Sequence, residues 1–310
     1  MKVLIIGAGV TGCFTAARLM HKGVDVSVLA RGDKATRLDH EGLRIRDGMT
    51  GEKATVRLNI VRAPIVDVFD VVMVCVQAQH RSSLAPLLRE LPGRPTVWYL
   101  GNTTQGYDAA TEQLGRARVL GGFPGVGGTW EGETLVYADR EKPDDKPFDR
   151  LIIGEAHSDA AAAADAVQNY LQGVGMNIER YVPIMAWHWS HIALILPLAG
   201  AVYHHDQDLE GVVADRALLR QTMRATAQGF AAIRRAGYTI LPRGLNIMRW
   251  IPAALGAGRI ATLLQSDFGR IALAGHAATA REEMHSFATD LLALAGANAG
   301  ADLREVLGAI

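Results

Sequence analysis

The sequence predicts an α/β fold, with an N-terminal Rossmann-type doubly wound sheet followed by a C-terminal all-helical domain. Three observations predict it. A glycine-rich turn separates an apolar run at 3–6 from a helix-like segment at 11–22. Short strand-like and helix-like segments then alternate, as a doubly wound parallel sheet requires. Beyond about residue 183 long helical periodicity replaces them, so we expect domains over 1–181 and 182–310.

The glycine-rich turn has the G-x-G-x-x-G spacing, and its residues are Gly7, Ala8, Gly9, Val10, Thr11 and Gly12. Gly7 permits a tight turn, Gly9 lets the backbone approach phosphates, and Gly12 lets the helix pack close to the strand. The helix N-terminus adds free N–H groups and the positive end of a dipole. We therefore expect these residues to bind a dinucleotide pyrophosphate. The alternative is a glycine-rich turn in another kind of α/β domain.

The end of the next strand, at 24–30, indicates which dinucleotide binds. An acidic residue there typically binds a ribose 2′-hydroxyl, whereas an Arg accommodates a 2′-phosphate. This chain has Ala30-Arg31-Gly32, with its first acid at Asp33. The sequence therefore favours NADP(H) over NAD and FAD, with Arg31 binding the 2′-phosphate. The alternative is that Arg31 is a solvated loop cation.

The remaining elements follow in order along the chain. We expect strands at 43–46, 54–58, 71–76, 96–100, 118–121, 129–138, 151–154 and 177–181, and helices at 82–91, 109–114 and 160–171. The polar stretch 139–149 reads as a solvated hairpin loop. In the second domain we expect helices at 184–203, 212–236 and 282–295. A substrate would fit in a cleft between the domains.

The composition of the chain indicates which binding partners and which cellular compartment to expect. The 310 residues carry 32 basic and 32 acidic side chains, so no excess charge points to nucleic acid. The longest apolar run, 192–203, is shorter than the ~20 residues that span a bilayer, so we expect no membrane. Cys13 and Cys75 form neither a disulfide framework nor a metal pattern. We expect two buried thiols, no metal site and a cytoplasmic location.

Over nearly its whole length the chain resembles the ketopantoate reductase family, which reduces 2-dehydropantoate to pantoate with NADPH in pantothenate biosynthesis. The motifs that indicate this are most specific in the first half. They are GAGVTG at 7–12, VLARG at 28–32, EGLRI at 41–45, VVMVCVQAQ at 71–79, YLGNTTQG at 99–106, GFPGVGGTWEGETLVY at 122–137 and LLQSD at 263–267.

The resemblance implies roles on the cofactor side. It assigns the pyrophosphate to the three glycines of the turn, the 2′-phosphate to Arg31, and the nicotinamide and substrate side to Asn102. Asn102 is followed by Thr103, where the family usually has Gly. Gln77, also expected at the cofactor, stands where the family often has a Lys, so a positive charge is missing there.

The catalytic side departs further from the family, whose second domain opens with W-x-K-x-x-x-N before a Pro, the Lys acting as general acid. Here the segment reads AWHWSHIALILP, and the Lys position falls on Trp189 or His188, depending on the anchor. The family's later substrate-binding Glu falls near Gly275 or His276. The resemblance therefore provides neither residue, and a different set of residues is needed.

A histidine could replace the lysine, because carbonyl reduction needs a proton on oxygen and His titrates near neutrality. We hypothesise that His191 is the general acid, and that His276 and Glu283 bind or orient substrate. His276 and Glu283 are seven residues apart and would share one face if both lay on the helix that ends near 295. The alternatives are that His191 is a core residue and that Glu283 is solvated.

Three functions remain open. The first is an NADPH-dependent reductase of a 2-oxo acid or another small carbonyl compound. The second is an NADP-binding sensor or interaction module without catalysis. The third is an NADP-dependent dehydrogenase acting on a hydroxy or amino acid. The apolar stripes of the helical domain suit either a core or a homodimer interface.

Overall fold

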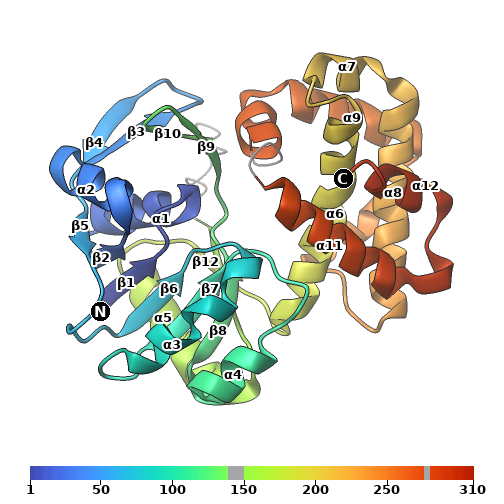
Figure 1. The fold of residues 1–310 in the computed structure, drawn as a ribbon. Helices are drawn as coiled ribbons and strands as arrows, with labels where there is room; N and C mark the ends of the chain where they lie inside the picture. The colour runs from blue at the N-terminus through green and yellow to red at the C-terminus, as the bar shows by residue number, and fades with distance from the viewer. Residues whose placement is uncertain (139–149, 276–279) are drawn as a thin grey trace. The chain divides into compact units, whose positions relative to one another are not determined.

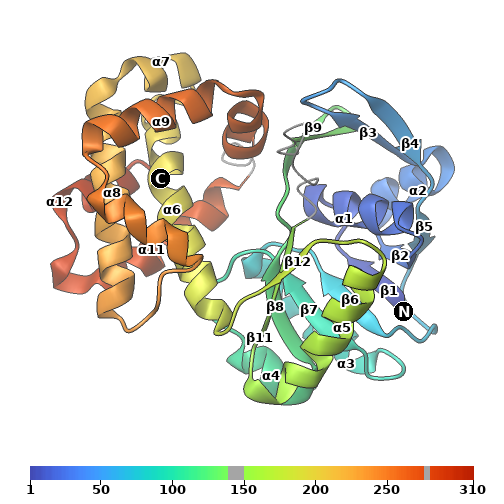
Figure 2. The same cartoon turned by 180° about the vertical axis from the view of Figure 1, so that it is seen from behind.

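A computed structural model describes residues 1–138, 150–275 and 280–310. These residues form two compact units, Met1–Ile184 and Met185–Ile310, each of which is described by itself (Figures 1 and 2). The sequence had placed this boundary between residues 181 and 182. The predicted hairpin loop at 139–149 lies outside the described residues.

The first unit is built on an eight-stranded sheet. Its strands are β1 (Lys2–Ile6), β2 (Asp25–Leu29), β5 (Asn59–Val61), β6 (Val71–Val74), β7 (Thr96–Leu100), β8 (Val119–Phe123), β11 (Leu151–Glu155) and β12 (Ile178–Arg180). The order is β12-β11-β8-β7-β6-β1-β2-β5. Six strands run parallel, while β11 pairs antiparallel with β8 and parallel with β12. This arrangement confirms the doubly wound sheet.

The central strands read as continuous apolar runs because both faces of the sheet are covered. The helices of this unit are α1 (Val10–His21), α2 (Gly32–Glu41), α3 (Ala85–Glu90), α4 (Asp108–Leu114) and α5 (Ala161–Gly173), with short 3₁₀ turns at Ala78–His80, Ser82–Leu84, Arg116–Arg118 and Ser158–Ala160. One apolar core joins the sheet to α1 and α5 through side chains such as Cys13, Leu19 and Val167.

A second, four-stranded sheet lies against α1. Its strands are β3 (Leu43–Asp47), β4 (Lys53–Val56), β9 (Gly127–Glu131) and β10 (Thr134–Ala138), in the order β4-β3-β10-β9. The prediction of one strand over 129–138 is wrong, because Gly132, at φ +57°, turns the chain into an antiparallel hairpin. The ring of Tyr137 packs 4.9 Å from that of Phe14 on α1.

The second unit is helical throughout its described residues, as predicted. It contains α6 (Ile184–His204), α7 (Leu209–Ala214), α8 (Arg216–Arg235), α9 (Ala253–Gln265), α11 (Arg281–Ala295) and α12 (Ala301–Leu307), with a 3₁₀ segment at Arg243–Trp250, a π-helix at Gly269–Ala274 and a last 3₁₀ turn at Gly296–Asn298. In Figure 1, α8 lies beside α12 and α9, with which it makes its main contacts.

Two features of these helices differ from the sequence prediction. The single helix expected over 212–236 is divided at Asp215, whose carboxylate accepts the N–H groups of Ala217 and Leu218 and so begins α8. The apolar run at 192–203 belongs to a longer helix, α6, of 21 residues. Alone among the described helices, α6 has the length and hydropathy to cross a bilayer, but 72% of its apolar window is buried inside the structure, as in a core helix.

Candidate active site

The glycine-rich turn joins β1 to α1, as the sequence predicted, and two of its glycines are sterically required. Gly7 has φ +111°, and a Cβ there would lie 2.7 Å from the carbonyl oxygen of Cys75. A Cβ on Gly12 would lie only 1.8 Å from the carbonyl oxygen of Gly7. Side chains at these positions would therefore separate β1 from β6 and α1 from the turn.

Gly9 is different, because a Cβ there would meet no atom of the described part of the chain within 4 Å. It is exposed, has an ordinary extended backbone (φ −77°) and is the N-cap of α1. The first intrahelical bond of α1 runs from the N–H of Cys13 to the carbonyl of Gly9, so the preceding N–H groups, including those of Val10 and Thr11, have no intrahelical acceptor. Open space beside exposed amide donors fits a phosphate group that approaches the backbone closely.

Four neighbouring parallel strands bring the predicted cofactor residues to one edge of the sheet. Arg31 follows β2, the glycine-rich turn follows β1, Gln77 follows β6 and Asn102 follows β7. The chain reverses its direction of winding between β1 and β6, and ligands of doubly wound sheets bind at such a switch point, outside the carboxyl ends of the strands. The strand order thus assembles one site from segments about 100 residues apart in sequence.

The basic residues after β2 have different surroundings. Lys34 lies 4.1 Å from the ring centroid of Trp130, and burial lowers the pKa of its ammonium group, as does neighbouring Arg37. Arg37 forms an ion pair of 2.7 Å with Glu133. Both partners belong to the β9–β10 hairpin. Arg31, by contrast, is exposed at the N-cap of α2, where an anion would also meet the positive end of that helix.

Both cysteines are buried, as expected. Burial raises the pKa of the Cys13 thiol to about 11 and that of the Cys75 thiol to about 12. The Cys13 thiol donates to the carbonyl of Ala8 at 3.4 Å, which ties α1 to the turn. These thiols therefore pack the cofactor site and stay protonated at neutral pH.

Sequence reasoning missed one polar residue at this edge, Arg81. Its guanidinium carbon lies 5.7 Å from the ring centroid of Tyr99, and a Cβ on Gly101 would lie 2.9 Å from its Nη2. Burial raises the pKa values of Tyr99 and Tyr107 to about 12, against the lowering effect of Arg81 on both. Only its place, a few residues after a buried strand, could have drawn attention to Arg81 in the sequence.

In the second unit, α6 positions the proposed general acid. His191 is half-buried and stacks on Trp187, with ring centroids 4.9 Å apart and an angle of 16° between the planes. His188, the alternative match to the family Lys, is completely buried. Ser190 is buried as well; its hydroxyl donates to the carbonyl of Ala186 and accepts the N–H of Leu241, so it ties α6 to the segment after α8.

Of the two substrate-binding residues proposed in the second unit, the structure describes Glu283 but not His276. Glu283 is buried, with 8% exposure, in the first turn of α11, so the alternative of a solvated carboxylate is wrong. His276 lies outside the described residues. The helix that carries Glu283, α11, begins at Arg281 after the non-helical Ala280, so it gives no support to a helix face shared with position 276.

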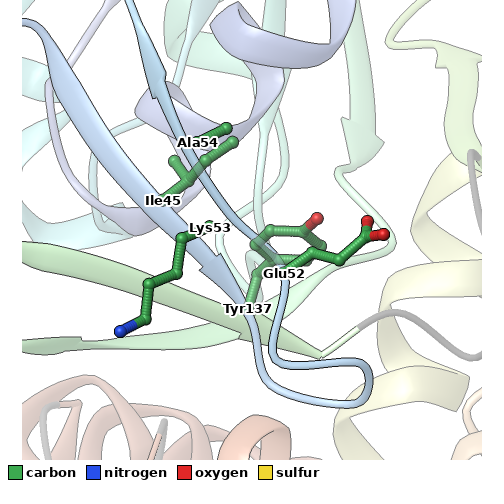
Figure 3. A pocket seen from close by; sticks show the side chains of 5 residues that line it. All are labelled: Ile45, Glu52, Lys53, Ala54 and Tyr137. Atoms are coloured by element: carbon green, nitrogen blue, oxygen red, sulfur yellow. The ribbon is translucent and has the colours of Figure 1, made fainter.

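A pocket of about 290 Å³ lies elsewhere in the first unit, on the four-stranded sheet. Figure 3 shows the side chains that line it. The side chains of Glu52 and Lys53 extend in opposite directions there, and the Tyr137 ring lies between them in this view. The remaining lining residues are Ile45 and Ala54. None of the predicted cofactor residues lines this pocket.

Comparisons with known proteins agree with this fold. Residues 3–145 match the family model described as ketopantoate reductase PanE/ApbA. The structure is similar to 2-dehydropantoate 2-reductase from Geobacter metallireducens GS-15, with 18% identity, a TM-score of 0.75, and coverage of 99% of this chain and 96% of that chain. No curated protein matches the sequence.

Two further solved structures share the fold. One is D-mandelate dehydrogenase with NADH and anilino(oxo)acetate, at 14% identity and a TM-score of 0.70, covering 100% of this chain and 98% of that one. The other is the dimeric ketopantoate reductase from Staphylococcus aureus, at 14% identity and a TM-score of 0.61, covering 95% and 99%. At these identities the likeness describes the fold.

Proposed function

We propose that this chain, whose residues 3–145 match the ketopantoate reductase PanE/ApbA family model, is an NAD(P)-dependent oxidoreductase that reduces a small 2-oxo acid or a similar carbonyl compound with NADPH. The observation that supports this most is the geometry of the glycine-rich turn. Gly7 and Gly12 are required by the protein's own backbone, whereas the space beside Gly9 is left to a ligand.

The preference for NADPH rests on Arg31. It is exposed at the end of β2, where no acidic side chain stands to bind a 2′-hydroxyl, while Lys34 and Arg37 pack against the β9–β10 hairpin. A 2′-phosphate would gain a charge-assisted hydrogen bond from the guanidinium. The D-mandelate dehydrogenase of the same fold holds NADH, so the fold alone does not decide the cofactor.

In this proposal the chain's residues bind, orient and move a proton. The nicotinamide, when bound, supplies the hydride. His191 donates the proton to the carbonyl oxygen, and its stacking on Trp187 fixes the plane of the imidazole ring. Asn102 and Glu283 hold the substrate's polar groups. Both are buried, so hydrogen bonds to them would be little weakened by water.

Steady-state kinetics with NADPH and NADH across a panel of 2-oxo acids tests the proposal. We expect turnover with NADPH, and we expect Arg31→Ala to weaken NADPH binding by roughly 10–100-fold while NADH binding changes little. His191→Ala should lower kcat by roughly 10²–10⁴-fold at an unchanged circular dichroism spectrum and NADPH Kd. Unchanged turnover in a folded His191→Ala variant would exclude His191 as the acid, and NADPH binding without any turnover would favour a sensor.

A second candidate function is oxidation of a 2-hydroxy acid with NADP⁺. It is favoured by the likeness to D-mandelate dehydrogenase, whose solved complex contains anilino(oxo)acetate. The same histidine would then accept the proton of the hydroxyl group. Product analysis with NADP⁺ and a panel of 2-hydroxy and amino acids distinguishes this reaction from the reductase.

A further inference from the structure

Arg81 has a feature that the glycine-rich turn and the proposed acid do not explain. Among the described residues, its Nε and Nη2 atoms are buried without a hydrogen-bond partner. These two nitrogens form one edge of the guanidinium, and their N–H groups point the same way, as a bidentate bond to a carboxylate requires. Buried donors of a charged group are costly to leave unpaired, so such an edge calls for an acceptor from outside the chain.

The surroundings of this edge exclude several structural roles. The guanidinium lies over the face of Tyr99, which contributes a weak cation–π interaction and no acceptor for the fork. The Tyr107 hydroxyl is hydrogen-bonded to the Arg81 side chain, but Nε and Nη2 still have no partner. Burial raises the pKa of Tyr107 to about 12, so its hydroxyl stays protonated and offers no negative charge. The ion pairs given by the described residues do not include Arg81, although most other arginines of this unit have carboxylate or carbonyl partners.

Its position identifies the part of the ligand that it would meet. Arg31 lies after β2 and the pyrophosphate turn after β1, while Arg81 follows β6 and lies against Gly101 at the end of β7. A dinucleotide whose phosphates lie at the turn and whose adenosine end lies toward β2 extends its other end toward β6 and β7. Arg81 is thus on the side of the reacting groups and away from both sets of phosphates.

We propose that Arg81 binds the carboxylate of the 2-oxo acid substrate through its Nε–Nη2 edge. This rests on the function proposed above and makes the substrate class specific: an anionic carbonyl compound is preferred to a neutral one. The fork would hold the carboxylate in a fixed plane, and the carbonyl carbon next to it would be oriented with it.

The decisive comparison is between an acid and its uncharged ester. Pyruvate and 2-oxo-3-methylbutanoate are each tested beside their methyl esters with wild-type protein, with Arg81→Met, and with Arg89→Met as a matched control, since Arg89 is an exposed arginine on α3. We expect Arg81→Met to reduce the acid-over-ester ratio of kcat/KM by roughly 100-fold while the NADPH Kd changes by less than about threefold. Arg89→Met should keep the wild-type ratio.

Thermal unfolding supplies a readout besides activity. Since the fork is unpartnered in the protein alone, Arg81→Met should unfold at the same temperature as wild type or a higher one. In the presence of NADPH, the unreactive 2-oxo acid mimic oxamate should raise the melting temperature of wild type and Arg89→Met but not of Arg81→Met. Arg81→Lys, which keeps the charge without the fork, should retain a smaller shift.

Several results would overturn the assignment. An unchanged acid-over-ester ratio would do so, as would a loss confined to NADPH affinity, which would assign Arg81 to the cofactor. A lower melting temperature or loss of folding in Arg81→Met would show that the guanidinium is a structural group. If wild type turns over neither acids nor esters, the proposed reductase function fails, and the oxamate shift still decides whether Arg81 binds a carboxylate.

Discussion

At the scale of single residues, the three glycines of the glycine-rich turn are required for different reasons. Gly7 and Gly12 are confined by the protein, since added Cβ atoms would approach the carbonyl oxygens of Cys75 and Gly7. Among the described residues, no atom lies within 4 Å of a Cβ added at Gly9, so none confines it. The G-x-G-x-x-G motif therefore combines two requirements. Gly7 and Gly12 are needed for folding and Gly9 for ligand binding, and experiment can separate the two.

Gly9→Ala and Gly12→Ala are expected to separate these requirements. Gly9→Ala should leave the unfolding free energy within about 0.5 kcal/mol of wild type, because its φ of −77° suits alanine, yet weaken NADPH binding at least roughly tenfold. Gly12→Ala should cost about 1–3 kcal/mol of stability, because the Cβ forces α1 away from the turn. Urea unfolding and NADPH titration measure both effects. Equal stability losses in the two variants would contradict this division.

At the scale of elements, the sequence predicted the strands and helices that have a strong apolar pattern and missed those in which few residues are buried. The strands at 3–6, 71–76 and 96–100 were predictable because buried parallel strands are continuous apolar runs. α2 was missed because only Ala35 and Leu38 of its ten residues are buried, which leaves little periodicity to detect.

The same distinction explains what was found of the candidate site. The cofactor residues follow strands, so a correct strand order places them together. The second-unit residues depended on helix boundaries, and the assumed helix joining positions 276 and 283 does not extend back past Arg281. Arg81 was missed because an unpartnered donor edge is a property of three-dimensional packing, which no local pattern reveals.

Asp215 gives an element-scale prediction, since it divides the single helix predicted over 212–236 into α7 and α8. Asp215→Ala should cost about 1 kcal/mol at pH 7 through loss of the α8 cap. The hydrogen bond from the N–H of Leu218 is the largest cause that lowers the carboxyl pKa, and interaction with His205 lowers it further. The stabilisation is therefore present above the unfolded-state pKa of about 3.9 and is lost as the pH falls through the lower folded-state pKa.

Urea unfolding from pH 7 to pH 2.5 measures this contribution. Asp215→Asn keeps a capping oxygen without the titrating proton, so its stability relative to wild type should rise as the pH falls through that range. A difference between wild type and Asp215→Asn that is constant with pH would show that the carboxylate does not stabilise the folded state through its charge.

At the scale of the whole molecule, the sheet order makes a prediction that no single residue makes. The strands β2, β1, β6 and β7 are adjacent and parallel, so their carboxyl ends share one edge of the first unit. β11 runs antiparallel to β8, so its carboxyl end lies at the opposite edge. A dinucleotide bound at the switch point should therefore slow amide hydrogen exchange in the four segments that follow β2, β1, β6 and β7. Exchange in the segment that follows β11 should be unchanged.

Hydrogen exchange with and without saturating NADPH tests this arrangement. We expect slower amide exchange at 7–13, 30–34, 75–81 and 101–104, because ligand binding suppresses local opening where the ligand contacts the backbone. The segment after β11, at 156–158, serves as the internal control and should exchange at the same rate in both states. At an NADPH concentration near the wild-type Kd, the Gly9→Ala variant should lose the protection in all four segments together, since they enclose one ligand. Protection that survives at 101–104 but disappears at 7–13 would mean that these strand ends respond to different binding events, and the single site inferred from the strand order would be wrong.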